Sequence, residues 1–132
     1  MRIELFSTGP DGSPNWIDVR EQIKGGDIFA VHDAAIVPVD PATGQTTELS
    51  YQKMDDTQFI ALFQRVVTGW SFQVPLPGSV AAAKSVLSDL EGDDLKKLKA
   101  EMDPLLKKVK SDDLPDPKTP ATDSPSGSST GT

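Results

Sequence analysis

The apolar side chains of this chain change their spacing near Met54, and that change determines the class of fold that we expect. Before Met54, short segments such as residues 2–6 alternate polar and apolar side chains, which is the period of a β-strand. After Met54, apolar side chains recur every three to four positions, which is the period of one face of an α-helix. We therefore expect an α+β fold: a small, mainly antiparallel sheet from the N-terminal half, packed by three to four helices from the C-terminal half.

About four short strands are expected before Met54. Residues 2–6 and residues 16–23 alternate polar and apolar side chains, and the loop between them holds two glycines and two prolines, so we expect the two strands to pair antiparallel. Residues 36–39 and 46–51 flank a five-residue connection that contains Pro41 and Gly44. A proline and a glycine in so short a connection predict a β-hairpin.

Three helices are predicted before residue 93. A short one covers residues 27–35 with Asp27 as its cap, although residues 28–31 could instead extend as a strand. The clearest one covers residues 55–70, and another covers residues 79–92. The helix at 55–70 carries one continuous apolar stripe: Phe59, Leu62, Phe63, Val66, Val67 and Trp70.

The last predicted helix covers residues 93–109 and contains Asp103-Pro104. Proline lacks a backbone N–H and clashes with the preceding turn of a helix. We therefore expect either a kink at Pro104 or a fresh helix that Asp103 caps, with Pro104 at its first position.

The last 22 residues, 111–132, differ in composition from the rest of the chain. They hold no aromatic side chain, one large aliphatic one (Leu114) and four of the eleven prolines. Such a segment buries too little apolar surface to offset the entropy of ordering it. We therefore expect a single domain over residues 1–110, followed by a disordered acidic tail rich in Pro, Ser, Gly and Thr.

The charge and the cysteine content exclude several classes of function. The chain has 13 Lys and Arg against 20 Asp and Glu, a net charge of −7, which disfavours binding to the phosphate backbone of nucleic acids. It has no cysteine, which excludes disulfides and thiolate metal sites. It has no apolar stretch of the roughly 18 residues that a membrane helix needs, so we expect a soluble cytoplasmic protein without a membrane partner.

Residues that could carry catalysis are few. His32 is the only histidine, and no G-x-S-x-G motif accompanies it, so we interpret it as a partly exposed helix residue. Residues 25–27 begin with two glycines but lack the G-K-[ST] of a phosphate loop. We expect no catalytic residue, no cofactor and no enzymatic activity.

Three acidic doublets are candidate metal ligands. Asp55-Asp56 and Asp93-Asp94 stand at the predicted starts of helices, where carboxylates cap free amides, and Asp112-Asp113 lies in the tail. None has the spacing of a calcium loop. We therefore predict capping and no metal site.

Three segments together resemble a known family. They are residues 1–8 with residues 13–17, residues 65–72, and residues 75–77 followed by an acidic-start helix with residues 103–106. In these segments the chain resembles the tail assembly chaperones of long-tailed phages that infect actinobacteria. The resemblance covers residues 1–110 and rests on packing and turn residues, so it carries over no catalytic position.

The resemblance implies a non-enzymatic chaperone in the cytoplasm of the bacterial host. Its partners would be the tape-measure protein, which it keeps soluble during tail morphogenesis, and the major tail protein, and it would act in many copies that could self-associate. An amphipathic helix of the partner could bind an apolar groove. The candidate partner-binding residues are Trp70, Phe72, Leu95, Leu98, Met102, Leu105 and Leu106. The alternative for all seven is a role in the core.

Two other functions stay open. The first is a structural subunit of the virion, either a head–tail joining protein or a minor tail protein, which would be found in purified particles. The second is a small acidic adaptor in a bacterial cytoplasm, whose gene would not lie beside a tape-measure gene.

Overall fold

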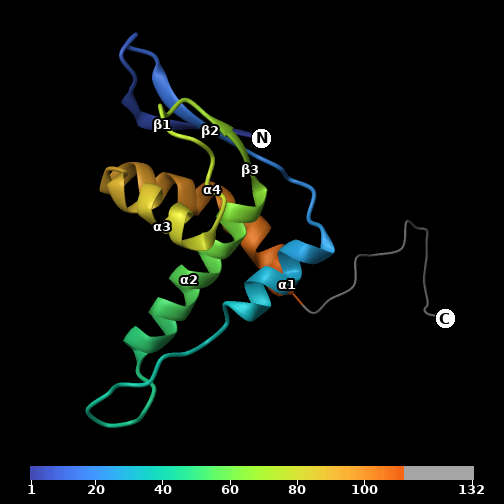
Figure 1. Cartoon of the computed structure of the whole chain (residues 1–132), viewed down its shortest axis with the longest axis vertical. Coiled ribbons are helices and arrows are strands. Elements are labelled where there is room, and N and C mark those ends of the chain that lie inside the picture. The colour runs from blue at the N-terminus through green and yellow to red at the C-terminus, as the bar shows by residue number, and fades with distance from the viewer. Residues whose placement is uncertain (112–132) are drawn as a thin grey trace, which may run out of the picture.

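A three-stranded antiparallel sheet lies over a group of four helices in the computed structural model, which describes residues 1–111 (Figure 1). This arrangement confirms the expected α+β fold. The tail predicted for residues 111–132 lies, beyond Ser111, outside the described residues. In chain order the elements are β1 (Arg2–Thr8), β2 (Pro14–Val19), α1 (Gly25–Asp33), α2 (Glu48–Val66), β3 (Val67–Trp70), α3 (Val80–Asp89) and α4 (Gly92–Lys110).

The strand order of the sheet is β1-β2-β3, with both pairs antiparallel. Ile17 at the centre of β2 lies opposite Ile3 of β1 on one side and Trp70 of β3 on the other. The antiparallel pairing predicted for the first two strands is therefore confirmed. The third strand comes from a segment that follows α2 rather than from the N-terminal half.

The predicted hairpin at residues 36–39 and 46–51 is wrong, because neither segment forms a strand. The turn between them does form: Gly44 has a φ of 70°, and its N–H donates to the carbonyl of Asp40 at 2.7 Å. The second segment starts α2 instead. The Thr47 hydroxyl accepts a hydrogen bond from the N–H of Ser50, and the Ser50 hydroxyl accepts one from the N–H of Thr47. This reciprocal cap satisfies amides at the helix start and outweighs the strand propensity of two threonines and a tyrosine.

The predicted helix at 55–70 is correct in its centre and wrong at both ends. It begins seven residues earlier, at Glu48, and stops at Val66, where the chain enters β3 directly. Val67 pairs with Val19. Gly69 lies beside Trp16, since a Cβ at Gly69 would come within 3.8 Å of the indole ring. Pairing with β2 thus overrides the helical spacing, which continues to Trp70 in the sequence.

α4 is one helix of 19 residues that passes through Pro104, so the alternative of a fresh helix is wrong. Pro104 and Ala100 are both exposed, and water can therefore satisfy the carbonyl that the proline leaves unpaired. Met102 and Leu105 on the opposite face are buried and hold both halves of α4 against the same core.

Of the three acidic doublets, Asp112-Asp113 lies outside the described residues. Asp93 and Asp94 stand in the first turn of α4, as predicted, whereas Asp55 and Asp56 do not start a helix. Asp55 and Asp56 lie inside α2, where they pair with Lys110 (3.3 Å) and Lys99 (2.9 Å) of α4. Asp94 is buried near the start of α4. Its carboxylate accepts hydrogen bonds from two N–H groups of β1, those of Phe6 at 2.7 Å and Ser7 at 3.2 Å.

The core lies between the inner face of the sheet and the four helices, as expected from the apolar stripes. Its buried members are Ile3, Leu5, Ile17, Val19, Val31, Phe59, Leu62, Phe63, Val66, Val67, Ala83, Leu87, Leu98, Met102, Leu105 and Val109. Three predicted partner-binding residues, Leu98, Met102 and Leu105, belong to this set.

Candidate functional site: a groove along α2

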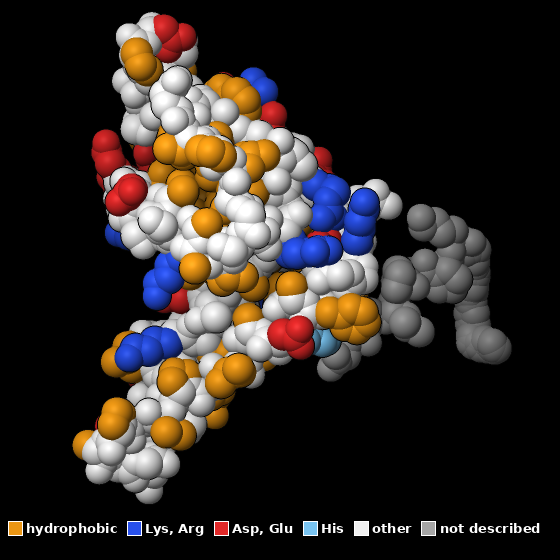
Figure 2. Space-filling model, in the orientation of Figure 1, with side chains coloured by type: hydrophobic (Ala, Val, Ile, Leu, Met, Phe, Trp, Pro, Cys, Tyr) orange, Lys and Arg blue, Asp and Glu red, His pale blue; other side chains and the backbone are white. Residues whose placement is uncertain are grey.

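The first half of α2 and the loop before it extend away from the sheet and the other helices (Figure 1). We call residues 34–55 the arm. The arm exposes four large apolar side chains: Ile36 (73% exposed), Val39 (58%), Leu49 (57%) and Tyr51 (51%). Figure 2 shows several separate hydrophobic side chains on it. Several exposed apolar side chains on one protruding segment make it a candidate site for binding a partner.

A hollow of about 550 Å³ opens where the arm joins the body, between α2, α3 and α4. Its floor is apolar. It consists of Phe59 and Ile60 from α2, Leu87 from α3 and Leu95 from α4. Phe59 and Leu87 are core residues that show only an edge, whereas Ile60 and Leu95 are half-buried. The hollow is therefore an exposed margin of the core.

A second hollow, of about 220 Å³, lies on the arm between the loop and α2 and includes Val39 and Leu49. Pro38 and Lys53 line both hollows, so the two lie side by side along α2. We call them together the α2 groove. From Leu49 to Ile60 it follows α2 for 12 residues, or about 16 Å.

The rim of the larger hollow is basic. Lys53, Lys84 and Lys99 line it from α2, α3 and α4, and Asp56 is its one acidic residue. Three lysines against one aspartate leave a formal charge of +2 in a chain whose net charge is −7. Figure 2 shows basic side chains above and below the hollow at the left of the view.

Lys99 is the only one of these lysines that is paired within residues 1–111. Its ammonium group lies 2.9 Å from the carboxylate of Asp56 and 5.7 Å from the ring centre of Phe59. The ammonium groups of Lys53 and Lys84 pair with no carboxylate among the described residues. Two exposed cations thus lie beside an apolar floor, where they can pair with carboxylates of a ligand.

The seven predicted partner-binding residues do not share one surface. Leu95 lines the α2 groove, and Leu106 lines a separate hollow of about 300 Å³ near the end of α4. Leu98 and Met102 have no exposed surface and Leu105 is 8% exposed, so these three fill the core, which was the alternative role. An α4 stripe built on them is closed to a partner in this structure.

Trp70 and Phe72 are half-buried at the end of β3 and pack against the core. The indole of Trp70 stacks on Phe63 with 6.3 Å between ring centres, and its edge meets Phe72 at 5.5 Å. The indole N–H donates to the carbonyl of Val74 at 2.9 Å. The contacts of Trp70 are thus largely satisfied within the chain.

The α2 groove includes residues that the sequence analysis did not select. Ile60 follows Phe59 directly and widens the apolar face of α2, which is a signal that the sequence contains. Lys53 and Lys84 stand 31 positions apart in the sequence, and no local pattern connects them. Only the packing of α3 beside α2 brings them to one rim.

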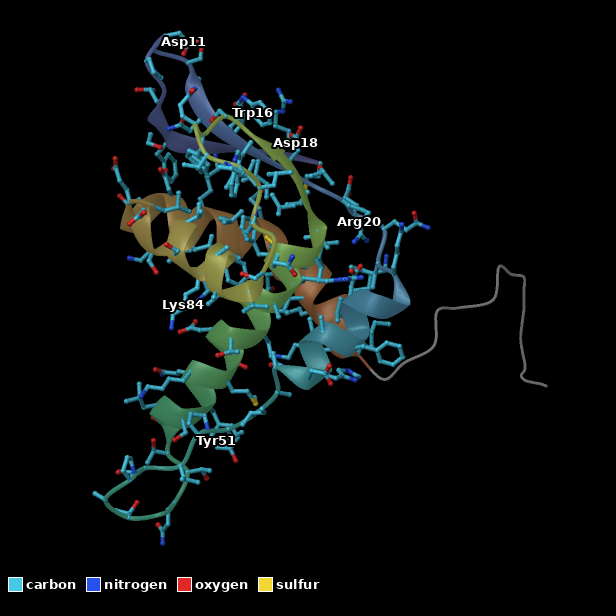
Figure 3. The ribbon with its side chains drawn as sticks, viewed as in Figure 1. Asp11, Trp16, Asp18, Arg20, Tyr51 and Lys84 are labelled. Carbon is cyan, nitrogen blue, oxygen red and sulfur yellow. The ribbon has the colours of Figure 1, made fainter. Side chains whose placement is uncertain are left out.

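A second group of charges, around Asp27, is internally paired. The buried carboxylate of Asp27 lies 2.8 Å from Nη1 of Arg20 and 3.2 Å from Nε of Arg65, and it accepts a hydrogen bond from the N–H of Lys24 at 2.8 Å. Burial raises the pKa of Asp27, but the hydrogen bonds from Arg20, Lys24 and Arg65 outweigh it and hold the pKa at about 2. This group joins the segment after β2 to α1 and α2 (Arg20 is labelled in Figure 3), so we interpret it as structural.

Within residues 1–111, no three acidic or histidine side chains converge as a metal site would require. His32 is exposed in the last turn of α1. None of the helices in this part of the chain is both long and apolar enough to span a bilayer.

Comparison with family models, curated proteins and solved structures found no match for the chain.

Proposed function

We propose that this protein is a non-enzymatic tail assembly chaperone of a long-tailed phage. It binds amphipathic helical segments of the tape-measure protein in the host cytoplasm and keeps them soluble until the major tail protein assembles around them. The observation that carries this proposal is the α2 groove, which continues from the margin of the core onto the exposed apolar arm. The resemblance of residues 1–110 to tail assembly chaperones supports the same function.

The dimensions of the groove suit a helix. A groove of about 16 Å matches the length of about three helical turns. An amphipathic helix of that length presents apolar side chains at positions i, i+3 or i+4, and i+7, and such a stripe can enter an apolar groove. Binding would also cover Val39 and Leu49, which the arm otherwise exposes to water.

The acidic surface suits a protein that keeps an aggregating partner dispersed. The net charge of −7 gives each bound copy a repulsive charge, and repulsion between like-charged complexes opposes their association. Many copies along one long partner would give the complex a large negative charge.

Thr57→Trp tests this proposal when the full chain is co-expressed with its tape-measure protein. Thr57 is exposed and lines the larger hollow, so an indole at this position would fill the groove without entering the core. Gln52→Trp is the matched control, because Gln52 is an exposed position of α2 that lines neither hollow. We expect the wild type and Gln52→Trp to keep the tape-measure protein in the soluble fraction, and Thr57→Trp to lose most of that effect.

Circular dichroism must first show that both variants are folded. A folded Thr57→Trp protein that still solubilises the partner would place the binding surface elsewhere. If the wild type leaves the solubility of the tape-measure protein unchanged, the chaperone function itself is wrong.

A further inference from the structure

We infer that the α2 groove selects amphipathic helices whose apolar stripe is flanked by Asp and Glu. This inference rests on the proposed function and adds the chemistry of the bound segment. It is based on the charges at the rim, which are independent of the apolar floor.

The rim concentrates positive charge on an acidic molecule. Lys53 and Lys84 lie on different helices, and neither has an acidic partner among residues 1–111. Lys84 extends from α3 beside α2, and Tyr51 marks the arm below it (Figure 3). A helix in the groove would therefore run past unpaired cations while its apolar stripe contacts Ile60 and Leu95.

Acidic residues beside that stripe would pair with these cations. Carboxylates at the edges of the bound helix would approach the ammonium groups at the boundary of an apolar contact, where screening by water is weaker than on an open surface. Such pairs mainly determine which partner is accepted and how fast it associates.

Basic residues at the same positions would oppose binding. They would approach Lys53 and Lys84, and both carboxylates of the groove are already engaged. Asp56 pairs with Lys99 at 2.9 Å, and Asp40 of the smaller hollow accepts a hydrogen bond from the N–H of Ala42 at 2.8 Å. Like charges placed next to each other suppress wrong partners. The rim therefore distinguishes between helices that have the same apolar stripe.

Two labelled peptides test the inference directly. They have the same length and the same leucine stripe, and they carry either Glu or Lys at every flanking position. Fluorescence anisotropy measures their affinity for the full chain at low and high salt. We expect the Glu peptide to bind about tenfold more tightly at low salt, since two exposed ion pairs contribute on the order of a tenfold change in affinity, and we expect the difference to shrink as salt rises.

Lys84→Glu identifies the rim as the source of the preference, and Lys108→Glu is its matched control. Lys108 is also an exposed lysine within a helix, but it lines neither hollow. We expect Lys84→Glu to weaken the Glu peptide several-fold and to strengthen the Lys peptide, while Lys108→Glu leaves both affinities within about twofold of the wild type.

The outcomes separate this inference from the proposed function. If the wild type binds both peptides with equal affinity and Thr57→Trp binds neither, the groove still binds helices, but its preference for acidic ones is overturned. Equal effects of Lys84→Glu and Lys108→Glu would overturn the role of the rim. If neither peptide binds, the inference is overturned. If sedimentation shows a dimer that Thr57→Trp dissociates, the inference is also overturned, and the occupant of the groove is a second copy of the chain.

Discussion

Asp27 has no exposed surface, yet it keeps its charge, because two arginines and a backbone N–H surround its carboxylate. Arg20 follows β2, Arg65 belongs to α2, and Asp27 itself lies in the first turn of α1. One carboxylate therefore connects three parts of the fold. Removal of one partner from a buried ion pair is costly, because the remaining charges lose their compensation.

Asp27→Asn should lower the free energy of unfolding by about 2–4 kcal/mol at pH 7. The pKa of Asp27 is about 2 in the folded protein, below the ordinary aspartate value of 3.8, so the folded state disfavours protonation. The ionised carboxylate therefore adds about 2 kcal/mol to the free energy of unfolding. This contribution is complete above about pH 4 and is lost as the pH falls through about 2. Urea denaturation between pH 2 and 7 should show a smaller pH dependence for Asp27→Asn than for the wild type. Asp33→Asn, a change at an exposed position of the same helix, should leave the pH dependence as in the wild type.

The helices show what the sequence could predict at the scale of elements. The apolar stripes of α2, α3 and α4 identify these helices correctly, because each stripe faces one continuous core. The ends of α2 depend on features that a stripe does not contain. Its start depends on the cap between Thr47 and Ser50, and its end on the pairing of Val67 with Val19, which is 48 positions away.

Thr47→Ala should loosen the start of α2 without unfolding the protein. The loss of an N-cap side chain costs about 1 kcal/mol, and the first turns of α2 have few buried contacts to compensate for it. We expect faster amide hydrogen exchange in residues 48–53 and unchanged exchange in the core helices. Thr46→Ala is the control, because Thr46 is exposed and forms no part of the cap. Equal exchange in the two variants would show that the cap does not hold the arm.

The candidate site arises only at the scale of the whole molecule. Of the seven residues selected from the sequence, one, Leu95, lines the α2 groove. The others could not be told apart from it, because apolar spacing does not distinguish a core position from the margin of the core. The basic rim depends on three helices that meet in space. The same dependence on distant segments holds for the sheet, because Asp94 of α4 accepts hydrogen bonds from N–H groups of β1 that are 88 and 87 positions away.

Asp94→Ala should therefore affect both stability and association. It would leave the N–H groups of Phe6 and Ser7 without their acceptor, and the loss of a partly buried hydrogen bond costs about 1 kcal/mol. It would also uncover an edge strand, and uncovered edges pair with other chains. We expect a lower urea midpoint and faster growth of thioflavin-positive aggregates near that midpoint. Asp93→Ala, a change at the exposed neighbouring position, should have neither effect. If the two variants unfold and aggregate alike, α4 does not protect the edge of β1.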